Sequence, residues 1–148
     1  MPAERVGVRY GIDMLLAGMV GQVTGQRVGL VTNDAAATSA TYTHLLTPTR
    51  LALLEAGVNL VSLFSPEHGL GAAAADGAEV GHGFDPLTGL PVHSLYGAQV
   101  RPTPQQLSGL DLLLFDIPDV GARFYTYIWT LSHAMEACAE AGLPLWVL

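Results

Sequence analysis

Short apolar runs recur along the chain at regular intervals, separated by polar turns and by segments with helical spacing. A continuous apolar run closed by Gly, Pro or Asn is typical of a strand that is buried on both faces. We therefore expect strands at 27–32, 58–64, 92–95, 111–115 and 144–148. Strands of this kind usually belong to a parallel sheet, because helices cover both of its faces.

The segments between these strands carry helical signals. We expect a short leading helix at 11–16, a helix within 43–56 that has Pro48 in its first turn, a helix that begins after Thr103, and a long helix at 123–141. Thr103, Pro104 and Gln106 form a capping-box pattern, and Gly142 is a typical helix stop. Alternating strands and helices predict an α/β fold with a mostly parallel sheet.

Two faces can be distinguished on the long helix. Spacing of four and three residues predicts a core-facing stripe, made of Phe124, Ile128, Leu131, Met135 and Cys138. The same spacing predicts a second, solvated face, made of Trp129, His133, Glu136 and Glu140.

Composition narrows the class of protein. The 148 residues suit one domain, and with 50% hydrophobic and 13% charged residues the chain is expected to fold. A net charge of −7 argues against nucleic acid and against an anionic membrane surface. The one cysteine, Cys138, excludes an internal disulfide and a cysteine-based zinc site. No signal peptide or membrane span is visible, so the default location is cytoplasmic, and a removed leader would make it secreted or periplasmic.

The most informative turn follows the apolar run at 58–64 and reads Ser65-Pro66-Glu67-His68-Gly69. It places a carboxylate and an imidazole at the carboxyl end of a strand, where ligands bind in open α/β sheets. Glu67 and His68 are suited to proton transfer near neutral pH. The alternative is a solvated turn with two ordinary polar residues.

A second group of polar residues follows the apolar run at 111–115. Asp116 and Asp119 lie between the strand and the long helix, and Arg123, Tyr125 and Tyr127 are expected in the helix's first turns. An arginine at a helix N-terminus suits a carboxylate anion, while Asp and Tyr suit sugar hydroxyl groups. Equally, Asp119 can cap the helix, Arg123 can pair with either aspartate, and both tyrosines can be core.

The sequence gives no reason to expect a cofactor or a metal. The turn at 32–35 has no Gly-rich nucleotide fingerprint, and there is no P-loop or nucleophile elbow. His44, His82 and His93 are isolated, whereas a zinc site needs at least three convergent ligands.

These motifs together resemble the DUF1343 proteins, which are associated with exo-β-N-acetylmuramidases of the NamZ type (glycoside hydrolase family 171). The resemblance runs from about Val28 to Leu148. It rests on VGLVTN at 28–33, LFSPEHGLG at 63–71, DPLTGLPVHSLYG at 85–97, RPTP at 101–104 and DIPDVGARFYTY at 116–127. Two departures stand out: NDAA at 33–36 replaces the common Asn-Gln-Thr/Ser-Gly, and Pro118 replaces a common Gln.

The resemblance implies a Rossmann-like domain followed by a smaller C-terminal domain, with an active site near their junction. Because Leu148 stops inside an expected core strand, we interpret residues 1–148 as a partial Rossmann-like catalytic domain, truncated before that second domain. The implied activity is removal of N-acetylmuramic acid from the non-reducing end of peptidoglycan fragments.

The resemblance also suggests roles for individual residues. Glycoside hydrolysis needs a proton donor together with a nucleophile or an activated water. The catalytic candidates are Glu67, His68 and Asp116, and the substrate-binding candidates are Asn33, Ser65, Asp119, Arg123, Tyr125 and Tyr127. Asp119 is the alternative to Asp116 as the second carboxylate. Two other classes stay open: a metal-assisted hydrolase of another substrate class, and a non-catalytic carbohydrate-binding or degenerate relative. The oligomeric state and the choice between retaining and inverting chemistry are not encoded in these motifs.

Overall fold

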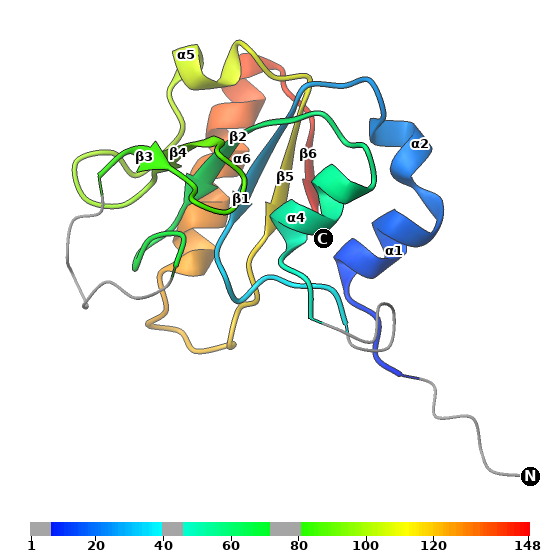
Figure 1. The fold of residues 1–148 in the computed structure, drawn as a ribbon. Coiled ribbons are helices and arrows are strands. Elements are labelled where there is room, and N and C mark those ends of the chain that lie inside the picture. The colour runs from blue at the N-terminus through cyan, green and yellow to red at the C-terminus, as the bar shows by residue number, and fades with distance from the viewer. Residues whose placement is uncertain (1–6, 40–45, 72–80) are drawn as a thin grey trace, which may run out of the picture.

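A computed structural model describes residues 7–39, 46–71 and 81–148 (Figure 1). The helices are α1 (Gly11–Gly18), α2 (Val20–Val23), α4 (Thr49–Glu55), α5 (Pro104–Leu107) and α6 (Tyr127–Ala141). The strands are β1 (Val28–Thr32), β2 (Leu60–Ser65), β3 (Gly83–Phe84), β4 (Pro91–Ser94), β5 (Leu112–Asp116) and β6 (Leu145–Val147). His44 lies outside the described residues, and so does the middle of the segment between β2 and β3.

The strands form one six-stranded sheet with the order β3-β4-β2-β1-β5-β6. Every neighbouring pair is parallel except β3 with β4, which is antiparallel. The predicted α/β fold with a mostly parallel sheet is confirmed, and each of the five expected strands is present within two residues of its expected bounds. β3 is an addition, because a two-residue edge strand leaves no apolar run in the sequence.

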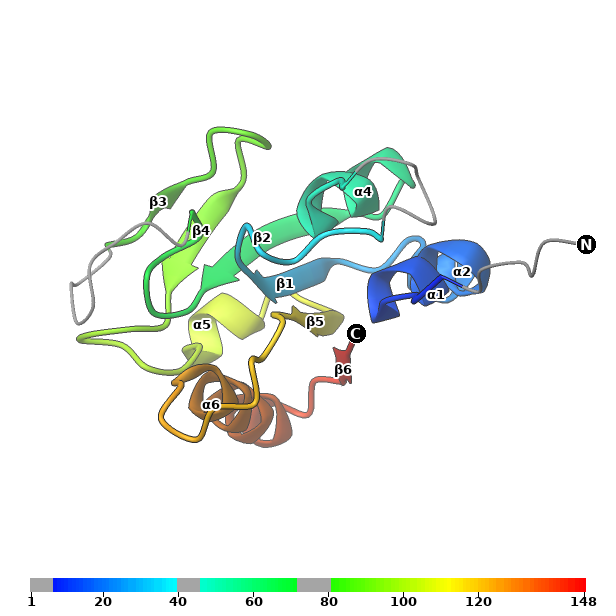
Figure 2. The ribbon, with the colours of Figure 1, turned by 90° about the horizontal axis from the view of Figure 1, so that it is seen from below.

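Helices cover both faces of the sheet, as Figure 2 shows from the end at which the strands finish. α1, α2 and α4 lie on one face, where their buried side chains Ile12, Leu15, Val23 and Leu53 pack on the sheet. α5 and α6 lie on the other, where Leu107, Tyr127, Ala134 and Cys138 pack on Phe64 and Leu113. This double cover explains why all five residues of β1 are buried.

The predicted caps of α5 and α6 are confirmed. The Thr103 side chain accepts a hydrogen bond from the Gln106 backbone N–H, and the Gln106 side-chain Oε1 accepts one from the Thr103 backbone N–H. Gly142 ends α6 with a φ of 63°, a left-handed conformation that favours glycine. α4 begins directly after Pro48, which agrees with the expected position of that proline at the helix start.

The predicted start of α6 is wrong, and its predicted core-facing stripe is confirmed only at Cys138, which is buried, and at Leu131, which is partly buried against the core. The helix begins at Tyr127, not at residue 123, so Arg123 and Tyr125 lie in the preceding loop. Its buried face consists of Tyr127, Thr130, Ala134, Ala137 and Cys138, whereas Phe124, Ile128 and Met135 are exposed by 87%, 53% and 53%. Small side chains let the helix approach the sheet closely. The larger apolar residues therefore do not mark the face of the helix that packs on the core.

In the part of the chain that the structure describes, every helix is too short or too polar to cross a membrane.

Candidate functional site

The strands β1, β2, β4, β5 and β6 are parallel, so their carboxyl ends lie at one edge of the sheet, and β1 and β5 end toward the bottom of Figure 1. The chain leaves β1 toward β2 on one side and later places β5 on its other side. This is a topological switch point, the place in an open α/β sheet where ligands bind. The two polar motifs predicted from sequence follow β2 and β5, so the fold brings both to this edge.

The turn after β2 has an unusual backbone. Gly69 N donates a hydrogen bond to Pro66 O (3.0 Å), which closes the turn. His68 has a φ of 68°, and among the described residues it is the one non-glycine with a positive φ. A non-glycine residue held in this region costs free energy and is common at functional sites. The strain therefore supports a role for this turn beyond connection.

Glu67 joins this turn to the loop before α6. Its carboxylate Oε2 accepts a hydrogen bond from Thr126 Oγ1 at 2.7 Å, although the two residues are 59 positions apart. The two motifs predicted to converge are thus in direct contact. Glu67 and His68 are both half-buried, an exposure that leaves a carboxylate accessible to a ligand.

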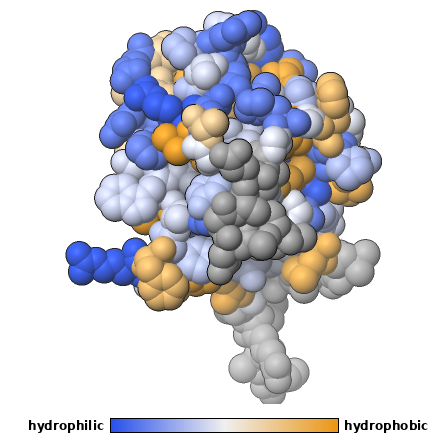
Figure 3. Space-filling model, turned by 90° about the vertical axis from the view of Figure 1, so that its left-hand side faces the viewer, coloured by the Kyte–Doolittle hydropathy of each residue, from blue (hydrophilic) through white to orange (hydrophobic). Residues whose placement is uncertain are grey.

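A surface cavity of about 520 Å³ lies over this contact and is lined by Glu67, His68, Phe124, Tyr125 and Thr126. That volume is within the range of small-molecule sites. Figure 3 shows the left-hand face of Figure 1, where scattered orange apolar side chains stand among mainly blue and white ones. Phe124, exposed by 87%, supplies an apolar wall next to the Glu67 carboxylate, a combination suited to a sugar ring.

Tyr127 and Asn33 are buried residues next to Tyr125, which lines the cavity. Asn33 Nδ2 donates to the Tyr127 hydroxyl (3.2 Å), and Asn33 Oδ1 accepts from Ala35 N (3.1 Å). The Tyr125 and Tyr127 rings meet edge to face, with centroids 5.0 Å apart. Burial raises the pKa of Tyr127, and Tyr125 and Glu67 raise it further, against the hydrogen bond from Asn33.

Asp116 is the last residue of β5 and is half-buried. Its Oδ2 accepts a hydrogen bond from Thr49 Oγ1 at the start of α4. Burial raises the pKa of the Asp116 carboxyl, and the negative charge of buried Asp13 adds to this effect, while the Thr49 hydrogen bond opposes it. The direction of this shift makes the Asp116 carboxyl a weaker acid than a free aspartate, which suits a group that takes part in proton transfer.

Three other predicted residues, Ser65, Asp119 and Arg123, are not among the residues that line the cavity. Ser65 is fully buried, and its hydroxyl has no hydrogen-bond partner among the described residues. Asp119 is exposed and accepts a hydrogen bond from Gly121 N (2.6 Å) within its own loop. Arg123 is exposed and makes no ion pair within 7–39, 46–71 and 81–148, so its guanidinium is available to an anion.

Sequence reasoning gave no functional role to Thr49, Thr126 or Phe124, and it placed Phe124 in the core-facing stripe of the long helix. Thr126 and Phe124 lie inside the 116–127 motif but carry no chemical signal of their own. The bond from Thr49 to Asp116 spans 67 positions, and no local pattern announces such a contact. In the described part of the chain, no group of three or more His, Cys, Asp or Glu residues is arranged to hold a metal ion.

Comparison with known proteins places this geometry in a family. The chain is 45% identical over 146 residues to the peptidoglycan beta-N-acetylmuramidase NamZ of Bacillus subtilis (strain 168), covering 99% of this chain and 34% of that protein. It is similar to a crystal structure of a DUF1343 family protein from Bacteroides fragilis NCTC 9343, with a TM-score of 0.81 and 40% identity over 98% of this chain. A second DUF1343 structure from the same strain gives a TM-score of 0.69 and 29% identity over 93% of this chain.

The chain spans about one third of each of these relatives: 34% of the muramidase and 35% and 33% of the two solved chains. The family model described as "Exo-beta-N-acetylmuramidase NamZ, N-terminal" matches residues 28–148, the same span over which the motifs resemble the family. The chain therefore belongs to the NamZ N-terminal family of DUF1343 proteins.

Proposed function

We propose that the full-length protein is a glycosidase that removes N-acetylmuramic acid from the non-reducing end of peptidoglycan fragments, in cell-wall turnover. One observation carries the proposal: the hydrogen bond between Thr126 and Glu67 joins two family motifs across a cavity at the ligand-binding edge of the sheet. The relative named as a muramidase supports the substrate class. Residues 1–148 form part of a Rossmann-like catalytic domain in this proposal.

Each role follows from the chemistry of the side chain. Glu67 is the acid/base group, since it is accessible in the cavity and held by Thr126. Asp116 is the second carboxyl, and His68 orients Glu67 or contacts the sugar. The exposed guanidinium of Arg123 pairs with the lactyl carboxylate of the substrate.

The remaining candidates contact the sugar. Tyr125 lines the cavity, while Tyr127 and Asn33 support it from below. Asp119 offers an exposed carboxylate to sugar hydroxyl groups. Ser65 supports the Glu67 turn from the end of β2.

The test uses the full-length protein and two chromogenic substrates, a β-linked N-acetylmuramide and the matching N-acetylglucosaminide that lacks the lactyl group. We expect turnover of the first, and a fall of about 10²–10⁴-fold in Glu67→Gln, because a lost general acid or base has that effect. Glu55→Gln, an exposed carboxylate at the end of α4, is the matched control and should keep wild-type turnover. The isolated 148-residue chain should be nearly inactive, as it spans one third of its relatives.

Thermal melts of both variants separate catalysis from folding, since Glu67→Gln keeps the shape of the side chain and an exposed substitution such as Glu55→Gln should change stability little. Binding without turnover by the wild type would identify a non-catalytic relative. Activity abolished by a chelator would identify a metal-assisted hydrolase. Wild-type turnover in Glu67→Gln would reject Glu67 as the catalytic group.

A further inference from the structure

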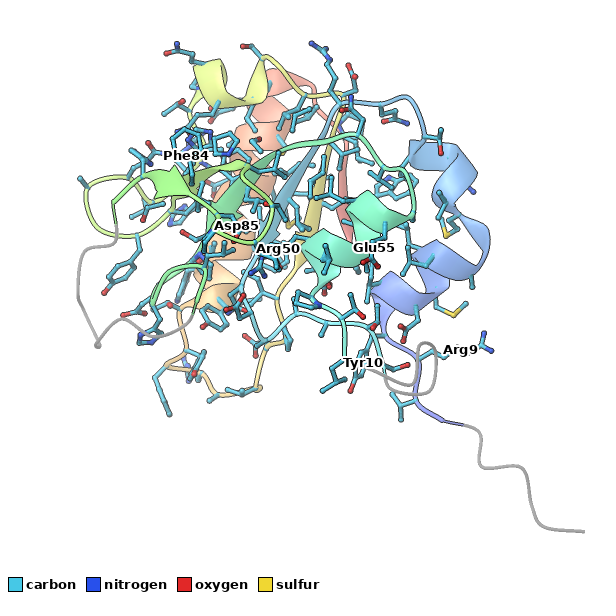
Figure 4. All side chains as sticks on the ribbon, viewed as in Figure 1. Arg9, Tyr10, Arg50, Glu55, Phe84 and Asp85 are labelled. Carbon is cyan, nitrogen blue, oxygen red and sulfur yellow. The ribbon has the colours of Figure 1, made fainter. Side chains whose placement is uncertain are left out.

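Arg50 is a buried arginine at the start of α4. Only 6% of its side chain is exposed, yet it pairs with two carboxylates: Nη2 lies 2.7 Å from Asp34 Oδ1, and Nε lies 2.9 Å from Asp85 Oδ2. Figure 4 shows the Arg50 and Asp85 side chains directed toward each other in the middle of the molecule. The arginine thereby joins three segments that are distant in sequence.

The Asp85 side of this cluster is rigid. Its side chain is 1% exposed and accepts further hydrogen bonds from Thr88 Oγ1 (2.6 Å) and Leu87 N (3.3 Å). Burial alone would raise the pKa of Asp85, but the bonds from Thr88 and Arg50 outweigh it and lower the pKa. Asp85 is therefore a fixed anion that anchors the arginine to the turn between β3 and β4.

This cluster is an unfavourable arrangement, in free energy, for a group whose role is only to stabilise the fold. Arg50 Nη1 is buried and has no hydrogen-bond partner among the described residues. An unsatisfied buried donor costs free energy, and buried ion pairs are often no more stabilising than apolar side chains of the same size. In some proteins such pairs instead fix one arrangement of the structure against others.

The Asp34 side of the cluster reaches the candidate site. Asp34 follows Asn33 directly, and its backbone N–H donates to Leu70 O at 2.8 Å. Its Oδ2 lies 3.8 Å from the position that a Cβ on Gly71 would take. Leu70 and Gly71 end the strained turn that carries Glu67 and His68, so Asp34 contacts that turn at its base.

The residue before Arg50 reaches the opposite side of the site. Thr49 donates its hydroxyl hydrogen to Asp116, and its backbone N–H donates to Ala36 O (3.0 Å). The first turn of α4 therefore holds the segment after β1 and the last residue of β5 directly, and it holds the turn after β2 through Asp34.

We propose that the Arg50–Asp34 pair is a positioning device that fixes the turn at 65–71, and with it the Glu67 carboxylate, relative to Asp116. This inference rests on the proposed function for its consequence in catalysis. The pair does not touch the cavity, so it acts through the geometry of Glu67. A displacement of about 1 Å in a catalytic group can cost about 10²-fold in rate.

The test uses the full-length protein and the half-exposed partner Asp34, because substituting Arg50 leaves Asp85 buried and unpaired and can unfold the chain. Asp34→Ala removes the pair, and Asp34→Asn keeps an oxygen that accepts from Arg50. Asp111→Ala is the matched control, since it breaks another Arg–Asp pair. That pair joins Arg27 and Asp111 at 2.8 Å and lies at the end of β5 opposite to Asp116.

We expect Asp34→Ala to lower kcat by about 10-fold or more with little change in KM, and to speed amide hydrogen exchange at 67–71. Asp34→Asn should recover much of the wild-type kcat and of the slow exchange at 67–71, and Asp111→Ala should change neither kcat nor exchange there. Wild-type kcat and unchanged exchange in Asp34→Ala would overturn the inference. If the wild type itself has no turnover, the proposed function fails, and the exchange at 67–71 alone decides whether the pair positions the turn.

Discussion

The two ends of strand β5 carry aspartates in opposite environments. Asp111, just before the strand, is exposed and pairs with Arg27 at 2.8 Å, and the hydrogen bonds from Arg27 lower its pKa to about 2. Asp116, the last residue of the strand, is half-buried, and burial raises its pKa. The pKa of one carboxyl is thus lowered by hydrogen bonds from an arginine, and the pKa of the other is raised by burial.

The same contrast holds between the amino ends of the strands, where Asp111 lies, and the carboxyl ends, where Asp116 lies. Asp111 has its charge balanced by a side chain and by a backbone N–H of Arg27, an arrangement that serves folding. The edge near Asp116 has a strained His68, a buried Ser65 hydroxyl without a partner among the described residues, and a Tyr127 of raised pKa. Local departures from stable geometry are expected where a protein binds or reacts, so the difference points to the carboxyl edge as the site.

The largest expected difference is in turnover, when the carboxyl at each end of β5 is replaced in turn in the full-length protein. Asp116→Asn should lower muramidase turnover by about 10²-fold or more, because it removes a carboxyl that can transfer a proton. Asp111→Asn should leave turnover unchanged. Equal losses in the two variants, measured as kcat/KM on a β-linked N-acetylmuramide, would remove the distinction between the two ends.

A smaller effect is expected on stability. Tyr127→Phe leaves the buried Asn33 amide without the hydroxyl that it binds at 3.2 Å, which should cost about 1–3 kcal/mol in the free energy of unfolding. Asp111→Asn should cost less than Tyr127→Phe, although it removes an ion pair, because exposed pairs contribute little. Urea unfolding measures both, and the reverse order would show that the exposed pair matters more than the buried hydrogen bond.

The smallest effect is the pH dependence of stability, which should have opposite signs at the two ends. The pKa of Asp116 is raised in the folded state. Its contribution to the free energy of unfolding is therefore fully present below the ordinary pKa of 3.8 and is lost as pH rises through the folded pKa. The lowered pKa of Asp111 means that its contribution is present above 3.8 and is lost as pH falls toward about 2.

Relative to the wild type, Asp116→Asn should therefore gain stability as pH rises from 3 toward 7, and Asp111→Asn should lose its deficit as pH falls toward 2. Unfolding free energies of each variant and the wild type across this range give both differences. The same sign of pH dependence in both variants would contradict the contrast in burial.

The fold was predictable because its signals are local and strong. Continuous apolar runs identified the parallel strands, and the Thr103 capping box and Gly142 marked helix ends that the structure reproduces. The face of α6 was not predictable in this way, because two stripes have the same spacing. Burial of Ala134 and Ala137, in place of Ile128 and Met135, depends on how closely the helix approaches the sheet.

The candidate site was predictable only in part. Strand ends and turn residues indicated that Glu67 and the 116–127 motif share one edge, and their contact through Thr126 agrees with this. The partners that hold the site were not visible, because Thr49–Asp116 and Arg50–Asp34 depend on where α4 lies in three dimensions. Apolar periodicity places a helix next to a sheet but does not specify the polar contacts of its first turn.

The most direct test of the central claim is to locate the bound substrate by hydrogen exchange. Full-length Glu67→Gln retains the shape of the site and should bind a β-linked N-acetylmuramide without hydrolysing it. We predict slower amide exchange on binding at 65–71 and 116–127, with no change near Arg27 and Asp111. Protection confined to the Arg27–Asp111 edge, or saturating binding that leaves 65–71 and 116–127 unchanged, would contradict the assignment of the carboxyl edge as the functional site.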